Sequence, residues 1–260
     1  EGGEQLMRPG FRSLSFGFSL LLIVCAGASA DAIRQTKAPF EDKFRQLEGE
    51  EWPAPSDYRN AAGAPGHRYW QQKVDYDVQV RLDEPARTVS GRAQVTYHNN
   101  SPDPLPYLWL LLDQNRFRRD SASELTRTVS GESISLTDVR RVKRYQEWEG
   151  GFTIRSVRDA GGRQMPFTIV DSLMRVDLPQ PVRANGGQVR FSIEWSFPMI
   201  EQKVIGGRSG YECFTAKDQD GNCIFLGAQW FPRLAVYSDY EGWHNKNFLG
   251  SGEFTLEFGD

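Results

Sequence analysis

The sequence predicts an all-β fold, a sandwich of mostly antiparallel strands that occupies residues 68–260. Apolar and polar residues alternate in the run 74–81, where Val74, Tyr76 and Val78 share one side, and this period is typical of a half-buried strand. Further strand-like runs follow at short intervals, separated by Gly, Pro, Asn and Asp, as in a sandwich or barrel. With 39% hydrophobic and 25% charged residues, the chain has the composition of a globular protein.

The start of the chain, residues 1–30, predicts a few upstream residues followed from Met7 by an export signal, rather than folded structure. Arg8 and Arg12 precede an apolar run at 14–24, and small residues follow that run up to Ala30. The apolar run is shorter than the roughly 20 residues that a transmembrane helix needs. We therefore expect cleavage after Ala30, no membrane span in the mature protein, and a periplasmic or extracellular location.

The next segments predict a leader and then the first strands. Residues 31–67 are rich in Ala, Pro and Gly, which is typical of a flexible leader or linker. The alternating runs 74–81 and 88–97 flank the turn-like residues 83–85, so they predict a β-hairpin. Residues 105–112 are almost wholly apolar, which predicts a strand buried on both faces.

The second half of the chain predicts one short helix and several more strands. In the basic stretch 113–145, Ser121 and Glu124 predict a capped helix at 121–125. Turn signals at 161–162, 179–181 and 185–187 separate the strands expected at 152–157, 167–170, 173–178 and 188–197. A last alternating run, 252–258, predicts a strand that ends just before Asp260, so we expect the parent protein to continue beyond this chain.

Two cysteines would remain after export, Cys213 and Cys223. Between them, Asp220 and Gly221 form a turn signal that would bring the two sulfurs together across a hairpin. In an oxidising compartment such a pair can form a disulfide. Two separate buried thiols are the alternative.

Motifs for the common catalytic chemistries do not occur in the sequence. His67, His98 and His244 are isolated, and neither H-E-x-x-H nor C-x-x-C is present, so no metal site can be assembled locally. A nucleophile elbow and phosphate-binding glycine loops are missing as well. The net charge of -3 comes from intermixed acidic and basic residues and favours no nucleic acid. We expect no catalytic residue and no cofactor in this chain.

Aromatic residues gather near the end of the chain, in the runs 229–233 and 236–243. Rigid rings beside amides suit a binding edge, although a core strand followed by a surface loop explains the same pattern. One functional hypothesis is a free-standing β-sandwich binding module, for carbohydrate or a surface partner, with Trp230, Trp243 and Tyr240 as its exposed platform.

Short motifs also lie in a fixed order along the chain after His67. They are Tyr-Trp-Gln-Gln at 69–72, Tyr-His-Asn-Asn-Ser-Pro-Asp at 97–103, Leu-Trp-Leu at 108–110, Gln-Asn at 114–115, Gln-Trp-Phe-Pro at 229–232 and the closing run 254–260. In this order they resemble the aminopeptidase N-like zinc metallopeptidases, in particular their exported bacterial members.

The resemblance implies a saddle-like N-terminal domain that packs on a thermolysin-like catalytic domain of the same protein. In that family H-E-x-x-H and a distant Glu hold zinc, so zinc and peptide hydrolysis are implied for the parent and not for this chain. By motif position Gln229 lines the pocket for the first residue of a peptide substrate, with Trp230 and Phe231 as neighbours. A glutamine amide suits that role, because its oxygen accepts from an ammonium group while its NH₂ donates to a carboxylate.

Overall fold

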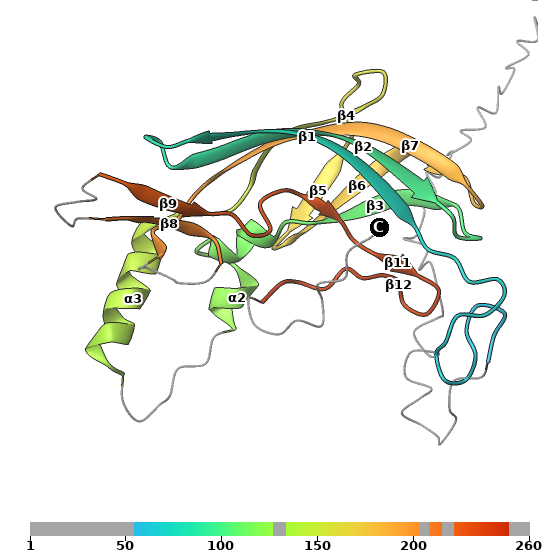
Figure 1. Cartoon of the computed structure of the whole chain (residues 1–260), viewed down its shortest axis with the longest axis horizontal. Coiled ribbons are helices and arrows are strands. Elements are labelled where there is room, and N and C mark those ends of the chain that lie inside the picture. Colours follow the sequence, from blue (N-terminus) through green and yellow to red (C-terminus); the bar gives the residue numbers. More distant parts are fainter. Residues whose placement is uncertain (1–54, 127–133, 203–207, 215–220, 250–260) are drawn as a thin grey trace, which may run out of the picture. The chain divides into compact units, whose positions relative to one another are not determined.

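The computed structural model describes residues 55–126, 134–202, 208–214 and 221–249, all within the compact unit Gln35–Asp260 (Figure 1). The predicted export signal and the strand expected at 252–258 lie outside these residues. The described part consists mostly of antiparallel strands, which confirms the predicted all-β sandwich. It contains no helix that is long and apolar enough to cross a membrane.

The first sheet has four antiparallel strands in the order β1-β2-β7-β4, which are β1 (Lys73–Asp83), β2 (Thr88–Asn99), β7 (Gly187–Pro198) and β4 (Thr153–Asp159). β1 and β2 form the predicted hairpin, with Tyr76 opposite Val95. β2 then pairs with β7 along its whole length. The period-2 alternation turns Val95 and Tyr97 of β2 inward, and both are buried.

The second sheet also has four antiparallel strands, in the order β10-β3-β6-β5, which are β10 (Arg233–Leu234), β3 (Leu105–Leu111), β6 (Leu173–Val182) and β5 (Phe167–Val170). β3 is the apolar strand that the sequence predicts to be buried on both faces. All its residues except Pro106 and Trp109 are buried, which confirms the prediction for most of the strand.

One expected strand boundary is wrong, because β6 runs through residues 179–181 to Val182. The pairing of β6 with β3 is irregular there: Asp177 lies opposite Tyr107, whereas Val182 lies opposite Leu105. The extra residues of β6 contain both prolines. A bulge of this kind needs no backbone N–H to pair with the neighbouring strand, so prolines are tolerated within it.

The hydrophobic core lies between the two sheets. Trp195 and Phe191 enter it from β7, and Leu108 and Met174 enter it from β3 and β6. Burial of a large apolar side chain contributes about 1.5–3 kcal/mol, so these residues account for much of the stability of the sandwich. The sandwich is the scaffold that carries the segment 227–244.

Three helical segments lie between β3 and β4, namely the 3-10 helix η1 (Asp113–Phe117), α2 (Ala122–Leu125) and α3 (Leu136–Glu147). The Ser121 side chain accepts a hydrogen bond from the Glu124 N–H at the start of α2, which confirms the predicted cap. α3 was not predicted from the sequence. Its apolar residues recur every third position among many charges, and Leu136, Val139 and Val142 stay exposed.

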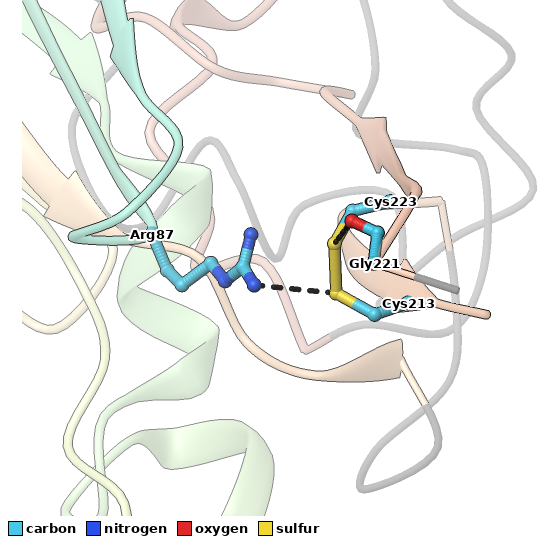
Figure 2. Close-up of a disulfide and its surroundings, with 4 residues drawn as sticks. All are labelled: Arg87, Cys213, Gly221 and Cys223. Atoms are coloured by element: carbon cyan, nitrogen blue, oxygen red, sulfur yellow. Dashed lines mark hydrogen bonds between the residues drawn. A yellow bond between two sulfur atoms is a disulfide. The ribbon is translucent and has the colours of Figure 1, made fainter. Parts of the chain in front are cut away.

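Two small hairpins complete the described part, one made of β8 (Gly210–Cys213) and β9 (Cys223–Leu226), the other of β11 (Tyr237–Ser238) and β12 (Gly242–Trp243). Cys213 and Cys223 are directly opposed in the first hairpin and form a disulfide (Figure 2). Arg87, from the turn after β1, lies over the Tyr211 ring, and its Nη2 atom is 3.3 Å from the Cys213 sulfur. These contacts tie the hairpin to the first sheet.

Candidate functional site

Gln229 lies in the loop between β9 and β10 and is half-buried. Its backbone φ is 51°, a left-handed conformation that residues other than glycine rarely adopt. This conformation costs about 1–2 kcal/mol for an L-residue. The surrounding structure must therefore hold the loop in place.

A buried glutamine holds the loop in place through hydrogen bonds. The side chain of Gln114, in η1, donates through Nε2 to the carbonyl oxygens of Ala228 at 2.8 Å and Gln229 at 3.3 Å. The same Nε2 lies 3.1 Å from the Ser209 hydroxyl oxygen, just before β8. Because Gln114 is buried, its amide needs protein partners, and its bonds to these carbonyls fix the backbone of the Gln229 loop.

The residue before Gln114 anchors the other end of the loop. Asp113 and Arg233 form an ion pair with a 2.5 Å contact, and the two side chains are only 3% and 5% exposed. Burial raises the pKa of the Asp113 carboxyl, while the charge of Arg233 opposes that shift. Since Arg233 begins β10, the pair holds the chain just after Gln229 against η1.

Asn115, the next residue of η1, braces two further segments. Its Nδ2 donates to the Asp171 carbonyl at 2.7 Å, and its Oδ1 accepts from the Phe152 N–H at 2.8 Å. Three consecutive buried polar side chains of η1 thus hold the Gln229 loop, β10 and the turn before β6. Short-range sequence patterns do not reveal this arrangement, because the partners lie far away along the chain.

Trp230 and Phe231, the predicted neighbours of Gln229, pack against the core more than they face solvent. Their ring centroids are 4.9 Å apart, and Phe231 meets the Tyr76 ring edge-on at 5.4 Å. The Tyr76 hydroxyl in turn accepts from the Leu234 N–H at 2.8 Å. The aromatic pair therefore connects the Gln229 loop to β1, and both rings are half-buried.

The exposed aromatic platform of the alternative hypothesis does not form. Trp243 is only 5% exposed and packs on the rings of Tyr97 and Tyr237 in the core. Tyr240 is 59% exposed, whereas Trp230 is half-buried beside Phe231. The residue types are those of a binding platform, but one of the three rings is not available to a ligand.

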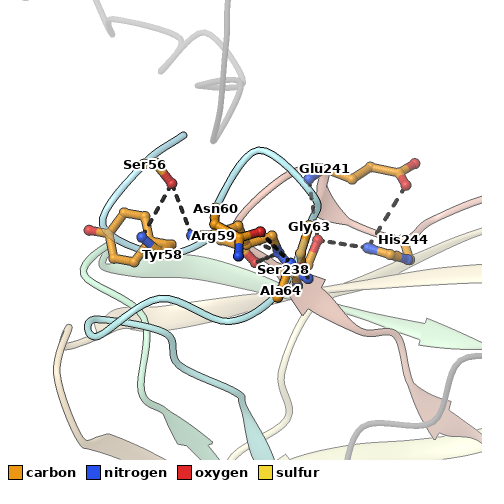
Figure 3. Close-up of polar contacts among 10 residues, drawn as sticks. Ser56, Tyr58, Arg59, Asn60, Gly63, Ala64, Ser238, Glu241 and His244 are labelled. Carbon is orange, nitrogen blue, oxygen red and sulfur yellow. Dashed lines mark hydrogen bonds and ion pairs between the residues drawn. The ribbon is translucent and has the colours of Figure 1, made fainter. Parts of the chain in front are cut away.

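The second small hairpin brings Ser238, His244 and Glu241 together (Figure 3). His244 Nε2 lies 2.8 Å from the Ser238 hydroxyl and 3.8 Å from a Glu241 carboxylate oxygen. In a hydrolase triad the carboxylate orients the opposite ring nitrogen from the one that faces the serine. Both contacts here use the same nitrogen, so the cluster stabilises the turn and lacks the geometry for nucleophilic catalysis.

The described residues do not fit the zinc that the resemblance implies for the parent. No group of three or more His, Cys, Asp or Glu side chains in the described part could hold a metal ion. His98 lies beside Asp75 on the first sheet, and His244 contacts Ser238 on the second hairpin.

By sequence, the chain matches no protein-family model and no curated protein. Its structure overlaps in part with an M1 zinc metallopeptidase from Deinococcus radiodurans. A mutant of that enzyme and the same mutant with a Tyr-Ser-Ala substrate both match with a TM-score of 0.32 and 14% identity, over 53% of this chain. The chain covers 23% of that enzyme. A TM-score of this size establishes no shared family, so the resemblance remains a proposal.

Proposed function

We propose that this chain is the non-catalytic N-terminal domain of an exported zinc aminopeptidase, which removes N-terminal residues from peptides. In the parent, zinc would activate the attacking water and polarise the scissile carbonyl. Its ligands would belong to a catalytic domain outside this chain. The sandwich would pack on that domain and line the pocket for the first residue of the substrate.

The observation that carries this proposal is an uncovered apolar edge on the core-facing side of β1. Val74, Tyr76 and Val78 on that side pack partly against the core. Val80 and Leu82 continue the same alternation but are 53% and 39% exposed. Apolar residues left open on the core-facing side of a sheet are typical of a surface that a neighbouring domain covers.

The Gln229 loop supports a role in the substrate pocket. Residues held in sparsely populated backbone conformations concentrate at functional sites, and Gln229 is held in one by Gln114. Such a brace presents the Gln229 amide from a fixed backbone. In the proposed pocket the amide oxygen accepts a hydrogen bond from the ammonium group of the substrate.

Export of the protein rests on two further observations. The Cys213–Cys223 disulfide suits an oxidising compartment outside the cytosol. The proposed signal within residues 1–30 would direct export, and the proposed leader at 31–67 would precede the proposed domain at 68–260.

The test uses the full-length gene product, with leucine p-nitroanilide as substrate. We expect Gln229→Ala to lower kcat/KM by about tenfold to a hundredfold, mainly through KM, because a hydrogen bond to a charged group contributes about 1.5–3 kcal/mol. Gln94→Ala is the matched control, since Gln94 is exposed on the outer face of β2. Equal kcat/KM values for the two variants would show that Gln229 does not contact the substrate.

A further inference from the structure

Residues 55–68, which we call the strap, form a small self-contained loop before β1. Within it the Ser56 hydroxyl accepts from the N–H groups of Tyr58 and Arg59, and the Asn60 side chain accepts from the N–H groups of Ala62 and Ala64 (Figure 3). The strap also closes on itself through a bridge between Arg59 and Pro65. Its own hydrogen bonds therefore define its conformation.

The Arg59 side chain joins the strap to the sandwich. Its Nε donates to the two carboxylate oxygens of Asp239, at 3.0 and 2.8 Å. The Asp239 side chain is 6% exposed and the Arg59 side chain 28%. The hydrogen bond to Asp239 raises the pKa of Arg59, so the guanidinium stays charged in this position.

The Arg59 guanidinium also lies between two aromatic rings. Its central carbon is 5.0 Å from the Tyr69 ring centroid and 5.1 Å from the Tyr240 ring centroid. Two ring faces and a carboxylate form a cage that matches a flat, delocalised cation, because each ring attracts positive charge and the planar guanidinium can stack. The compact, strongly hydrated ammonium of lysine suits such a cage less well.

A cavity of about 430 Å³ lies directly beside the cage. Its walls include Trp70, Gln71, Val236 and Ser238, in addition to the cage residues themselves. The cavity offers apolar area and amide groups next to the guanidinium, which is the mixture that binds the backbone of a short peptide. The site therefore has room for more than one side chain.

We propose that Tyr69, Tyr240 and Asp239 form a binding site for an arginine side chain of a peptide, and that Arg59 of the strap occupies this site from within the chain. The strap is then an intramolecular competitor of the peptide. Because Arg59 reaches the site from a segment outside both sheets, its displacement requires no rearrangement of either sheet. This proposal does not depend on the proposed aminopeptidase function.

The test is the Arg59→Ala variant of the full chain, titrated with N-acetyl-arginine amide by isothermal calorimetry. We expect this variant to bind the probe at least about tenfold more tightly than the wild type, because the competing side chain is gone. N-acetyl-citrulline amide, which has the same shape without the charge, should not bind. Equal affinity of the arginine probe for variant and wild type, or no binding to either, would overturn the proposal.

Arg68→Ala is the matched control variant. Arg68 also pairs with a carboxylate, Asp57, and lies over a tyrosine ring, Tyr58, but both partners belong to the strap and the pair is exposed. We expect Arg68→Ala to bind the arginine probe as weakly as the wild type does. Tight binding of the probe by this control would show that any loosening of the strap increases affinity. It would contradict the proposal that Arg59 competes with the probe for the cage.

A second measurement keeps the proposal testable if Arg59→Ala does not fold. Tyr240 is exposed, so Tyr240→Ala should fold, and we expect it to accelerate amide hydrogen exchange in the strap by about tenfold through loss of one cage wall. Val170→Ala, a similarly exposed position on β5, should leave exchange in the strap unchanged. Unchanged exchange in Tyr240→Ala would show that the cage does not hold the strap.

Discussion

The buried ion pair between Asp113 and Arg233 fixes the position of the chain just after the Gln229 loop. The ion pair between them is almost completely removed from solvent. We expect Asp113→Ala to lower the free energy of unfolding by about 3–5 kcal/mol, because it leaves the buried Arg233 charge without its carboxylate. Urea-induced unfolding followed by tryptophan fluorescence measures this change.

The exposed pair Arg118–Asp120 provides the control for that experiment. Asp120→Ala should cost less than about 1 kcal/mol, since exposed ion pairs contribute little. If Asp113→Ala is as mild as Asp120→Ala, the buried pair does not anchor β10 as described.

At the level of single residues, the sequence pointed to Gln229 as a candidate pocket residue, which stays a prediction, but it did not reveal what holds the Gln229 backbone. The motif order singled out Gln229, yet its left-handed backbone depends on Gln114, which lies 115 residues earlier in the chain. Likewise, Arg233 meets a partner 120 residues away. Such contacts depend on the pairing of β10 with β3, and nothing in the local residue pattern encodes that pairing.

Among the elements, the packing of β2 against β7 depends on a glycine. Gly91 lies opposite Trp195, and a Cβ atom at Gly91 would come within 2.4 Å of the Trp195 ring. We expect Gly91→Ala to lower the free energy of unfolding by about 1–3 kcal/mol, because the wholly buried ring has to move within a close-packed core. Chemical denaturation of the purified variant measures this loss.

Two comparisons test whether the contact between the added Cβ atom and the Trp195 ring causes the loss of stability. Gly161→Ala places its Cβ no closer than 3.3 Å to Asp159, so we expect a much smaller effect there. In a Trp195→Phe background, Gly91→Ala should cost less than in the wild type, since the smaller ring leaves space. An undiminished cost in that background would point to a cause other than the ring.

The long strands could be predicted because one face of each is turned toward the core, so apolar and polar residues alternate along the sequence. β5 has the predicted boundaries, and the β1–β2 hairpin follows the predicted runs closely. β10, β11 and β12 have only two residues each, too few for any period to show. α3 escaped prediction because charged residues outnumber its apolar residues, which makes the segment hydrophilic on average although the apolar residues recur with a helical period.

For the molecule as a whole, the half-buried Tyr76 and the buried Tyr97 predict sensitivity to alkali. Burial raises the pKa of Tyr76 to about 12 and raises the pKa of Tyr97 well above its ordinary value. The unfolded chain loses these protons near pH 10, whereas the folded chain keeps them. The stabilising contribution is therefore complete below about pH 10 and is lost as the pH rises toward about 12.

Tyr76→Phe isolates one of these two groups. Between about pH 10 and pH 12 we expect the stability of the wild type to fall more steeply than that of the variant, by up to about 1.4 kcal/mol per pH unit. The free energy of unfolding at several pH values gives both slopes. Parallel slopes would mean that the Tyr76 proton is not coupled to folding.

The two sheets, the braced Gln229 loop and the uncovered edge of β1 are the features on which the aminopeptidase proposal rests. The described residues themselves contain no set of metal-binding side chains. Under the aminopeptidase proposal, the zinc ligands belong to the parent protein and are encoded beyond the Asp260 codon.

The most direct test is the DNA sequence downstream of the Asp260 codon. An in-frame H-E-x-x-H motif with a more distant Glu is the result that the aminopeptidase proposal predicts, because these residues supply the zinc ligands and the general base. A stop codon immediately after Asp260 would contradict the proposal and leave the sandwich as a free-standing domain.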